Sequence, residues 1–311
     1  MHFLRAVPEN IHFGFYAADL KPVLVIQSGD TVQIETSRCD DVKNLQIDDS
    51  IKSEFAGAAS KKAEGGPGPH TLTGPIYIEG AESGDVLEVH IQDVQLRCEY
   101  GVNRLIDSGV LADEFPEEKD IVVTRMDHKE KRVKDFFPGV SLPLRPFFGS
   151  MGVAPLPASG RMSSLPPGIH AGNLDIKDLV QGSTLYIPIQ VKGALFSCGD
   201  GHACQADGEA DGTGLETPLT GIFTFVINHD MKLKGPMAET PTHYMTIGFH
   251  KSLRTAARIA IREMVDFLTE TKGLTREQAY ALVSLVGDLH VSQLVNLLEG
   301  VRFLLPKNLF S

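Results

Sequence analysis

Three segments of this chain share one pattern, in which a turn containing glycine precedes side chains that alternate between apolar and polar. They lie at residues 27–34, 82–89 and 180–187. Glycine provides the positive φ that such turns can require, and alternation with a period of two is typical of strands that bury one face. In the second segment we expect Leu87 and Val89 to face inward and Glu88 to face solvent. The pattern favours a mainly β fold.

Further short strands are expected between turns rich in glycine and proline, at 23–26, 121–125, 187–191, 221–227 and 290–295. The 311 residues include 30 Gly and 18 Pro, a larger share than in ordinary globular proteins. Many short strands separated by such turns are typical of a β-sandwich or a barrel. We expect a jelly-roll-like β-sandwich with a small α-helical part near its C-terminal end.

Helix is expected only late in the chain, in two segments at 252–272 and 275–287. Along the first segment, apolar residues recur with the i, i+3, i+4 spacing of an amphipathic helix. Ser252 can cap its start, and Gly273 lies just past its end. The second segment begins with the sequence Thr-Arg-Glu-Gln at 275–278, which is typical of a capping box.

The length of 311 residues fits one large domain or two ordinary ones. We place an N-terminal β-rich region at 1–147 and a C-terminal β-rich region, with both helices, at 148–311. A single intertwined domain is the alternative. Residues 115–146 mix charge with proline and phenylalanine, so we expect this segment to leave the core.

Acidic residues outnumber basic ones, 40 to 29, and the formal net charge is −11. This balance argues against nucleic-acid binding through overall charge and against a polybasic membrane anchor. No stretch approaches about 18 uncharged apolar residues, and residues 1–10 lack the apolar core of a signal peptide. The four cysteines form no C-x-x-C pair, which favours free thiols in a reducing compartment. We expect a cytoplasmic protein with no nucleic-acid or membrane partner.

The segment 198–209 combines several groups that carry chemistry: Asp200, His202, Asp207 and Glu209. No lysine or arginine occurs between Lys192 and Lys232, so these carboxylates would repel one another unless a cation binds. Asp200 and His202 are two residues apart and would point to the same side of a strand. Imidazole and carboxylate ligands together suit Zn²⁺, with other divalent ions open. The alternative is a solvated acidic turn without a ligand.

A second segment, from Gly149 to Asp175, contains five Gly and four Pro in 27 residues. We expect its backbone to be set by turns, with little central-strand character. It ends in His170, Asn173 and Asp175, which can bind a metal ion or position an amide. The two segments are therefore the candidates for a common site.

Within these segments, His-Ala-Gly-Asn-Leu-Asp at 170–175 and Gly-Asp-Gly-His-Ala-Cys-Gln at 199–205 form a specific pair of motifs. Together with further stretches, they resemble the acetamidase/formamidase family over most of the chain. Those stretches are 73–81, 84–87, 151–155, 193–196, 207–209, 242–244 and 253–268.

The resemblance implies a fold rich in β-sandwich with a small α-helical part. It implies hydrolysis of short carboxamides, such as formamide or acetamide, to ammonia and a carboxylic acid, with metal dependence in some members. The chain departs from the family pattern at three positions: Ala171 replaces a glycine, Cys204 replaces an alanine and Ala206 replaces a glycine. The differences at Cys204 and Ala206 bear on the size of the substrate. Asp40 or Asp41 matches an early acidic motif of the family loosely.

The roles of individual residues are hypotheses built on this resemblance. Asp175, Asp200 and His202 are the expected ligands of a divalent metal ion, with His170 as a fourth candidate. Zn²⁺ is the expected ion, and Ca²⁺ is the alternative. The metal ion would activate a water molecule and polarise the amide carbonyl.

Two acid–base residues and three substrate contacts complete the expected site. Glu209 would take the proton from the water and return it to the leaving nitrogen, with His202 as the second catalytic group. Asn173 would hold the substrate amide or the oxyanion. Gln205 and His243 are the other expected substrate contacts.

Two other functions stay open. One is a metal-independent hydrolase of C–N bonds with a nucleophile such as Cys204, although nearby carboxylates would raise the pKa of its thiol. The other is a non-catalytic β-sandwich binding protein. The apolar stripe of the first predicted helix can pack on its own sheet or on a second copy, and we expect a homo-oligomer.

Overall fold

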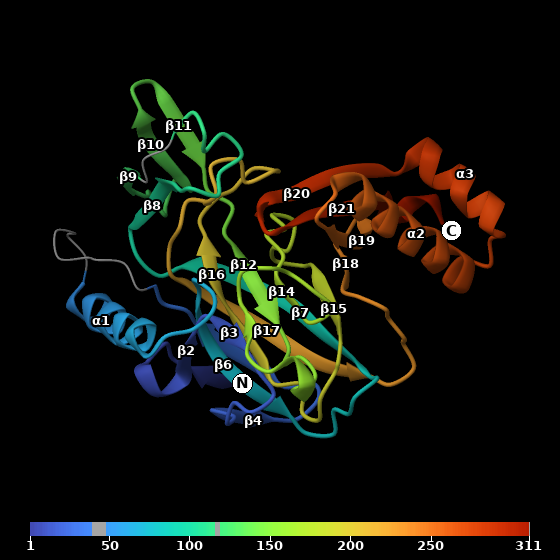
Figure 1. The fold of residues 1–311 in the computed structure, drawn as a ribbon, viewed down its shortest axis with the longest axis horizontal. Helices are drawn as coiled ribbons and strands as arrows, with labels where there is room; N and C mark the ends of the chain where they lie inside the picture. Colours follow the sequence, from blue (N-terminus) through green and yellow to red (C-terminus); the bar gives the residue numbers. More distant parts are fainter. Residues whose placement is uncertain (39–47, 116–118, 311) are drawn as a thin grey trace.

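The computed structural model describes residues 1–38, 48–115 and 119–310, and its framework is two β-sheets (Figure 1). Over these residues, the larger sheet has nine strands that are antiparallel to their neighbours except at the first pair. Their order is β1 (His2–Leu4), β5 (Thr31–Glu35), β17 (Leu219–Asn228), β7 (Val86–Leu96), β15 (Thr184–Pro188), β18 (Met237–Glu239), β19 (His243–His250), β21 (Leu298–Pro306) and β20 (Asp288–Asn296).

In the same ranges the smaller sheet has six strands. Five lie in the order β14 (Ala171–Asn173), β12 (Phe147–Gly152), β16 (Phe196–His202), β6 (Thr71–Ile78) and β2 (Ile11–Phe13), and β4 (Leu24–Ile26) also pairs with β6. The short strand pairs are β3 (Phe15–Tyr16) with β13 (Met162–Ser163), β8 (Tyr100–Leu105) with β9 (Lys119–Arg125), and β10 (Arg132–Phe137) with β11 (Val140–Pro143). The helices are α1 (Asp49–Glu64), α2 (Leu253–Lys272) and α3 (Arg276–Val286), with 3₁₀ turns at Pro8–Asn10, Pro157–Ser159 and Lys307–Leu309.

The inner faces of the two large sheets form the main core. Phe148 of the smaller sheet contacts Phe223 of the larger one, with ring centroids 5.3 Å apart, and Phe196 contacts Phe225 at 5.0 Å. All four rings are buried, and burial of aromatic side chains is a large stabilising contribution. The expected mainly β sandwich is confirmed. The core contains residues from both sides of the predicted boundary between residues 147 and 148. The division of the chain into two regions at that boundary stays a prediction.

Most strands form where the alternating pattern predicts them. In β7, Leu87 and Val89 are buried and Glu88 is half-buried, as expected. The predicted strand at 187–191 is wrong in its second half, because β15 ends at Pro188. Proline has no N–H to continue the ladder of hydrogen bonds.

The two late helices are confirmed, and each ends at the predicted glycine. Thr275 forms the expected capping box with Gln278, whereas Ser252 stands at the N-cap of α2 without a side-chain hydrogen bond. Figure 1 shows α2 and α3 at one end of the molecule and α1 at the opposite end. None of the helices in the described ranges combines the length and apolar character that crossing a membrane needs.

The expectation that helix occurs only late in the chain is wrong, because α1 was missed. Its sequence is mostly small or charged, so its apolar side is narrow. Ile51 and Phe55 pack with Tyr100, and Ala58 packs with Ile11. The spacing 51, 55, 58 is a helical signal, but it is too short to stand out from the surrounding polar residues.

The expectation that turns set the backbone of residues 149–175 is also wrong, because the first four of these residues belong to a strand. Strand β12 runs to Gly152 in the middle of the smaller sheet, between β14 and β16. Ser150 is in register with Asn173 on one side and with Gly199 on the other. This arrangement brings both motif-bearing segments next to one strand.

Candidate active site

Three of the predicted ligands meet where β14, β12 and β16 lie side by side. His202 Nδ1 is 3.8 Å from Asp175 Oδ1, and His202 Nε2 is 3.5 Å from Asp200 Oδ2. Their potential ligand atoms all lie within 4.8 Å of one another. Asp175 and His202 are buried, and the Asp200 side chain is only 9% exposed. The pairing of Asp200 with His202 that their spacing predicts is therefore present.

Gly149 leaves the space into which these three side chains converge. A Cβ atom at this position would lie 2.4 Å from Asp200 Oδ2, 2.6 Å from Asp175 Oδ1 and 2.8 Å from His202 Cε1. The Gly149 carbonyl oxygen accepts hydrogen bonds from the backbone N–H groups of Leu174 and Asp175, at 2.8 and 3.1 Å. Glycine thus keeps open a small space flanked by two carboxylates and an imidazole.

A second group of potential ligands shares the same histidine. His202, Glu209 and Glu216 are all buried, and their ligand atoms also lie within 4.8 Å of one another. Glu216 Oε1 is 3.0 Å from His202 Nε2, and the other Glu216 oxygen pairs with Arg38. Sequence reasoning gave Glu216 no role, although it lies in the stretch without lysine or arginine.

The backbone is strained at three of the acidic residues. Asp175, Asp200 and Glu209 have φ values of +49°, +54° and +47°. Left-handed backbone is uncommon for residues other than glycine, although aspartate tolerates it better than glutamate. Such strain typically clusters at functional sites, where surrounding contacts hold it in place.

Several buried polar atoms around this space have no hydrogen-bond partner among the described residues: Asn173 Oδ1, Asp175 Oδ1, Glu209 Oε2 and both ring nitrogens of His202. The close approach of His202 to its carboxylate neighbours lacks the alignment of a hydrogen bond. Buried polar atoms in native proteins are nearly always paired with protein, water or an ion. The cluster is therefore suited to a bound cation and a polar ligand.

The acidic residues of the cluster fall into two groups, one with a raised pKa and one with a lowered pKa. Burial, with repulsion from Asp200, raises the pKa of Asp175 to about 8, and burial with repulsion from Asp175 raises the pKa of Glu209 well above its usual range. Burial also opposes ionisation of Asp200, but His70 and His202 outweigh it and hold the pKa of Asp200 below its usual range. A cation between these groups would favour ionisation of all of them.

His202 is the main positive group within this cluster. Burial lowers the pKa of its imidazole, but the charges of Glu216 and Asp200 outweigh burial and raise the pKa well above the usual value. Burial likewise opposes ionisation of Glu216, yet His202 and Arg38 keep the pKa of that carboxyl low. In the absence of a cation, His202 would therefore carry the proton that balances its neighbours.

A pocket of about 530 Å³ opens onto the cluster. Asn173, Asp200, Glu209 and Glu216 line it, so the predicted amide-holding residue faces the predicted ligands and base. Asn296, at the end of β20, also lines it and donates a hydrogen bond to Asp175 Oδ2 at 2.5 Å. Sequence reasoning missed Asn296, because no local pattern links it to a residue 121 positions earlier.

The structure does not bring His170 or His243 into the cluster of potential ligands in the described ranges. His170 is buried with its ring against Tyr16, the centroids 5.1 Å apart, and burial lowers the pKa of its imidazole to about 4. His243 lines a different pocket beside Asp178. Their roles as fourth ligand and substrate contact stay predictions without support from this geometry.

Two other predicted residues lie at the margin of the site. Gln205 donates a hydrogen bond to the Asp175 carbonyl oxygen at 3.5 Å, and its own amide oxygen is unpaired within the described ranges. Asp207 points away and binds Lys177 and Arg302, each at 2.8 Å. The predicted early acidic residues, Asp40 and Asp41, lie outside the described residues.

The described cysteines, Cys98, Cys198 and Cys204, are free thiols as expected, and Cys39 lies outside the described residues. Burial raises the pKa of the Cys204 thiol above its usual range, although His202 opposes that shift. A raised pKa disfavours the thiolate form that a nucleophile needs.

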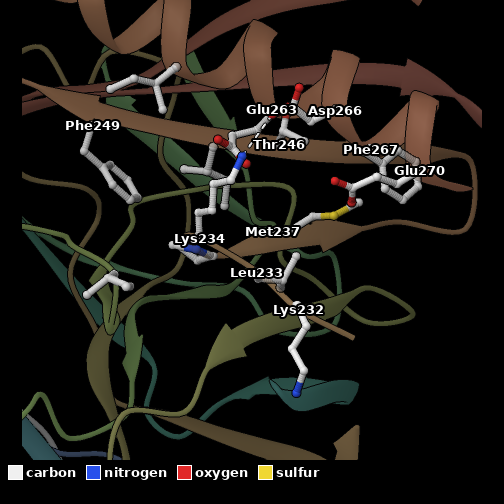
Figure 2. A pocket seen from close by; sticks show the side chains of 15 residues that line it. Lys232, Leu233, Lys234, Met237, Thr246, Phe249, Glu263, Asp266, Phe267 and Glu270 are labelled. Carbon is white, nitrogen blue, oxygen red and sulfur yellow. Dashed lines mark hydrogen bonds and ion pairs between the residues drawn. The ribbon is translucent and has the colours of Figure 1, made fainter. Parts of the chain in front are cut away.

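Another pocket, of about 250 Å³, lies against α2 (Figure 2). Lys234 and Asp266 on its wall pair with each other at 3.0 Å, and Figure 2 shows Glu263 and Glu270 on the same side. Its lining includes none of the cluster residues. The candidate active site is therefore the cluster beside Gly149, together with the pocket of about 530 Å³ that Asp200, Glu209 and Glu216 line.

Comparisons with known proteins identify the family of this chain. A family model described as the Acetamidase/Formamidase family matches residues 6–163 and 156–311. A formamidase from Methylophilus methylotrophus is 32% identical over 45% of this chain and 47% of its own, and an acetamidase from Mycolicibacterium smegmatis is 27% identical over 47% and 50%. The chain spans about half the length of these curated relatives.

Solved structures match almost the whole chain. An acetamidase from Bacillus halodurans is 33% identical, with a TM-score of 0.83, covering 99% of this chain and 98% of its own. A protein from Thermoanaerobacter tengcongensis described as an acetamidase/formamidase is 29% identical, with a TM-score of 0.84, covering 99% and 96%.

Proposed function

Since the chain belongs to the acetamidase/formamidase family, we propose that it hydrolyses small carboxamides to ammonia and the corresponding carboxylic acids. One observation carries this proposal. Asp175, Asp200 and His202 converge on the space beside Gly149, and Asp200 also lines the adjacent pocket together with Asn173 and Glu209. An amide needs an activated nucleophile, stabilisation of the oxyanion and protonation of the leaving nitrogen, and this set of residues can serve each need.

We further propose that the three converging side chains hold a divalent cation, with Zn²⁺ as the expected ion and Ca²⁺ as the alternative. The unpaired Asp175 Oδ1 and His202 ring nitrogens support this assignment, as does the mixture of imidazole and carboxylate ligands. A divalent cation there would lower the pKa of a water molecule to about 7 and polarise the amide carbonyl.

Glu209 is the proposed proton carrier. Its Oε2 is buried without a partner among the described atoms, and burial raises its pKa, which makes this carboxylate a stronger proton acceptor than an ordinary one. Glu209 would accept the proton of the attacking water as the new C–O bond forms. It would then donate that proton to the nitrogen as the C–N bond breaks and ammonia leaves.

The other polar residues would position the ligands and the substrate. Glu216, whose Oε1 lies 3.0 Å from His202 Nε2, would hold the imidazole in place through its charge, and Asn296 would fix the carboxylate of Asp175. Asn173 Oδ1, a buried acceptor, would bind an N–H of the substrate amide.

The test is ammonia release from formamide and acetamide, measured on purified protein before and after chelation, with metal content determined on the same samples. We expect activity to fall at least about 100-fold with the loss of the cation and to return when Zn²⁺ is added back. Full activity in metal-free protein would remove the cation from the proposal. No ammonia release by metal-loaded protein from any amide tested would remove the amidase function and favour a binding protein.

Two further parts of the prediction remain proposals. Exposed apolar side chains on α3, near the start of β20 and at the β20–β21 turn support a homo-oligomer; they are Tyr280, Leu285, Leu289 and Leu297. Light scattering coupled to size-exclusion chromatography tests it, and a monomer at micromolar concentration would contradict it. The free thiols Cys98, Cys198 and Cys204 support a cytoplasmic location.

A further inference from the structure

A second and larger pocket, of about 700 Å³, adjoins the candidate active site. Glu209 and Thr213 line both pockets, so the two are neighbours on either side of the proposed proton carrier. The second pocket lies beneath the hairpin of β10 and β11, which projects from the sandwich in Figure 1. Its position makes it the place where part of a substrate bound beside Gly149 would lie.

Apolar side chains form most of the wall of this second pocket: Phe136, Phe137, Leu142, Cys204, Ala206 and Leu215. The hairpin supplies the aromatic part, because Phe136 and Phe137 end β10 and their rings lie 4.7 Å apart. Phe137 is 46% exposed, although a surface aromatic usually buries more of its area. A wall of this kind offers an apolar ligand group a place to leave water.

The charged groups at the rim of this pocket are already paired. Lys177 binds Asp207 at 2.8 Å, and Asp211 accepts a hydrogen bond from Asn103 at 2.9 Å. By contrast, Glu209 Oε2 and Gln205 Oε1 are buried without partners within the described ranges, and both residues line the pocket. The pocket therefore has apolar walls, a neutralised rim and free acceptors where it joins the active site.

We propose that this pocket binds the acyl group of the substrate, and that the protein prefers primary amides whose acyl chain is apolar and about four to six carbons long. The proposal rests on the proposed amidase function. Formamide and acetamide have no group that reaches beyond the amide itself, so they would leave the apolar walls in contact with water. Each methylene that leaves water contributes to binding in proportion to its area.

The polarity of the two pockets sets the orientation of the substrate. Asn173 Oδ1, which is buried without a partner among the described residues, gives the first pocket an acceptor that suits the NH₂ group. The apolar second pocket suits the carbon chain on the other side of the carbonyl. The substituent therefore lies on the carbonyl carbon, and the nitrogen is unsubstituted.

The experiment measures kcat/KM for ammonia release by the metal-loaded enzyme from formamide, acetamide, butyramide and hexanamide. We expect kcat/KM to rise roughly two- to four-fold per methylene up to hexanamide. N-butylformamide, whose release of butylamine is measured in parallel, is expected to be a poorer substrate than hexanamide.

Two variants test whether the second pocket causes the preference. Ala206→Phe fills the pocket from an exposed position, and Phe137→Ala removes part of its aromatic wall. Both are expected to lower the ratio of kcat/KM for hexanamide to that for formamide by at least about ten-fold. Val140→Ala is the matched control, because Val140 is an exposed apolar residue on the same hairpin and is not part of the pocket wall. It is expected to leave the ratio within about two-fold of the parent value.

Each other outcome overturns a defined part of the proposal. If kcat/KM falls with every methylene, the acyl-pocket inference is wrong and the amidase function stands. If hexanamide remains preferred in both pocket variants, the preference arises elsewhere. If N-butylformamide is the better substrate, the orientation is wrong. If no amide releases ammonia, the proposed function itself has failed.

Discussion

Asn296 at the end of β20 donates a hydrogen bond to the carboxylate of Asp175, 2.5 Å away and 121 residues earlier in the chain. Gln293 holds this corner, because its side-chain oxygen accepts hydrogen bonds from the backbone N–H groups of Val295 and Asn296, at 2.9 and 3.1 Å. The adjacent loop is tied to the same strand, since Leu294 donates to the Gly208 carbonyl oxygen at 3.1 Å. The hairpin of β20 and β21, the last hairpin of the described chain, therefore positions Asp175 and the loop that contains Glu209.

Asn296→Ala is expected to weaken cation binding without removing any of the three proposed ligands. The Asp175 carboxylate would lose its only described side-chain donor, and loss of such support typically costs 10- to 100-fold in metal affinity. Competition with a zinc indicator measures the affinity. Asn10→Ala is the control, because Asn10 makes its side-chain hydrogen bond on the exposed surface. Unchanged affinity in the Asn296 variant would show that Asp175 needs no such support.

Gly149→Ala is expected to remove cation binding and to lower kcat/KM by about 100-fold or more. Its methyl group would occupy the space within 3 Å of Asp175, Asp200 and His202, and β-strand backbone itself tolerates alanine. Metal content per protein and kcat/KM are the measurements. Gly235→Ala is the matched control, because open space surrounds that glycine and its φ is ordinary. Full metal occupancy in the Gly149 variant would contradict the proposed site.

Glu209→Gln is expected to lower kcat by about 10²- to 10⁴-fold while the protein still binds one equivalent of cation. The amide keeps the shape of the side chain but can neither accept the proton of the water nor pass it on. Steady-state kinetics and metal analysis on the same preparation separate the two properties. Loss of the cation together with activity would instead make Glu209 a ligand, in line with its closeness to His202 and Glu216.

The stability of the cation-free protein is expected to fall as pH rises from about 6.5 to about 8. Burial, with repulsion from Asp200, raises the folded-state pKa of Asp175 to about 8, and burial raises that of Glu209 in the same direction. The folded state then binds more protons than the unfolded chain across this range, so the free energy of unfolding decreases with pH. The raised pKa of His202 also makes the free energy of unfolding decrease as pH rises.

Contributions of the opposite sign act at lower pH. The low pKa of Asp200 matters only below about pH 4, whereas burial lowers the pKa of His170 to about 4 and makes stability rise with pH up to about 6.5. A saturating divalent cation is expected to flatten the dependence between about pH 6.5 and 8, because it stabilises the ionised ligands. Thermal denaturation across this pH range, with and without Zn²⁺, measures both effects. A Tm that rises with pH in the cation-free protein would contradict the assigned pKa shifts.

Sequence reasoning located the parts of the fold and site that short-range pattern determines. The alternation in β7 and the capping box at Thr275 are local, and so is the two-residue spacing of Asp200 and His202. Asp175 was singled out as the end of the segment rich in glycine and proline, and the resemblance to the family supported its role as a ligand. These features need no knowledge of which strands become neighbours.

The features that were missed depend on tertiary neighbours. Gly149 matters because β12 lies between β14 and β16, a pairing that no local pattern predicts. Asn296 and Glu216 reach the cluster only after the sheets have formed. Conversely, His170 follows the family motif closely, yet its ring packs against Tyr16 outside the two groups of potential ligands in the described ranges.

The last hairpin also gives the chain an order of assembly during synthesis. All three proposed ligands lie between residues 175 and 202, but the groups that fix their surroundings, Asn296 and the buried Arg302, are translated about 100 residues later. A nascent chain still attached at residue 280 would hold every ligand and lack the strand that orders them. Catalytic competence would therefore arrive only after residue 302 has been translated, so that a chain lacking the hairpin of β20 and β21 is an inactive one.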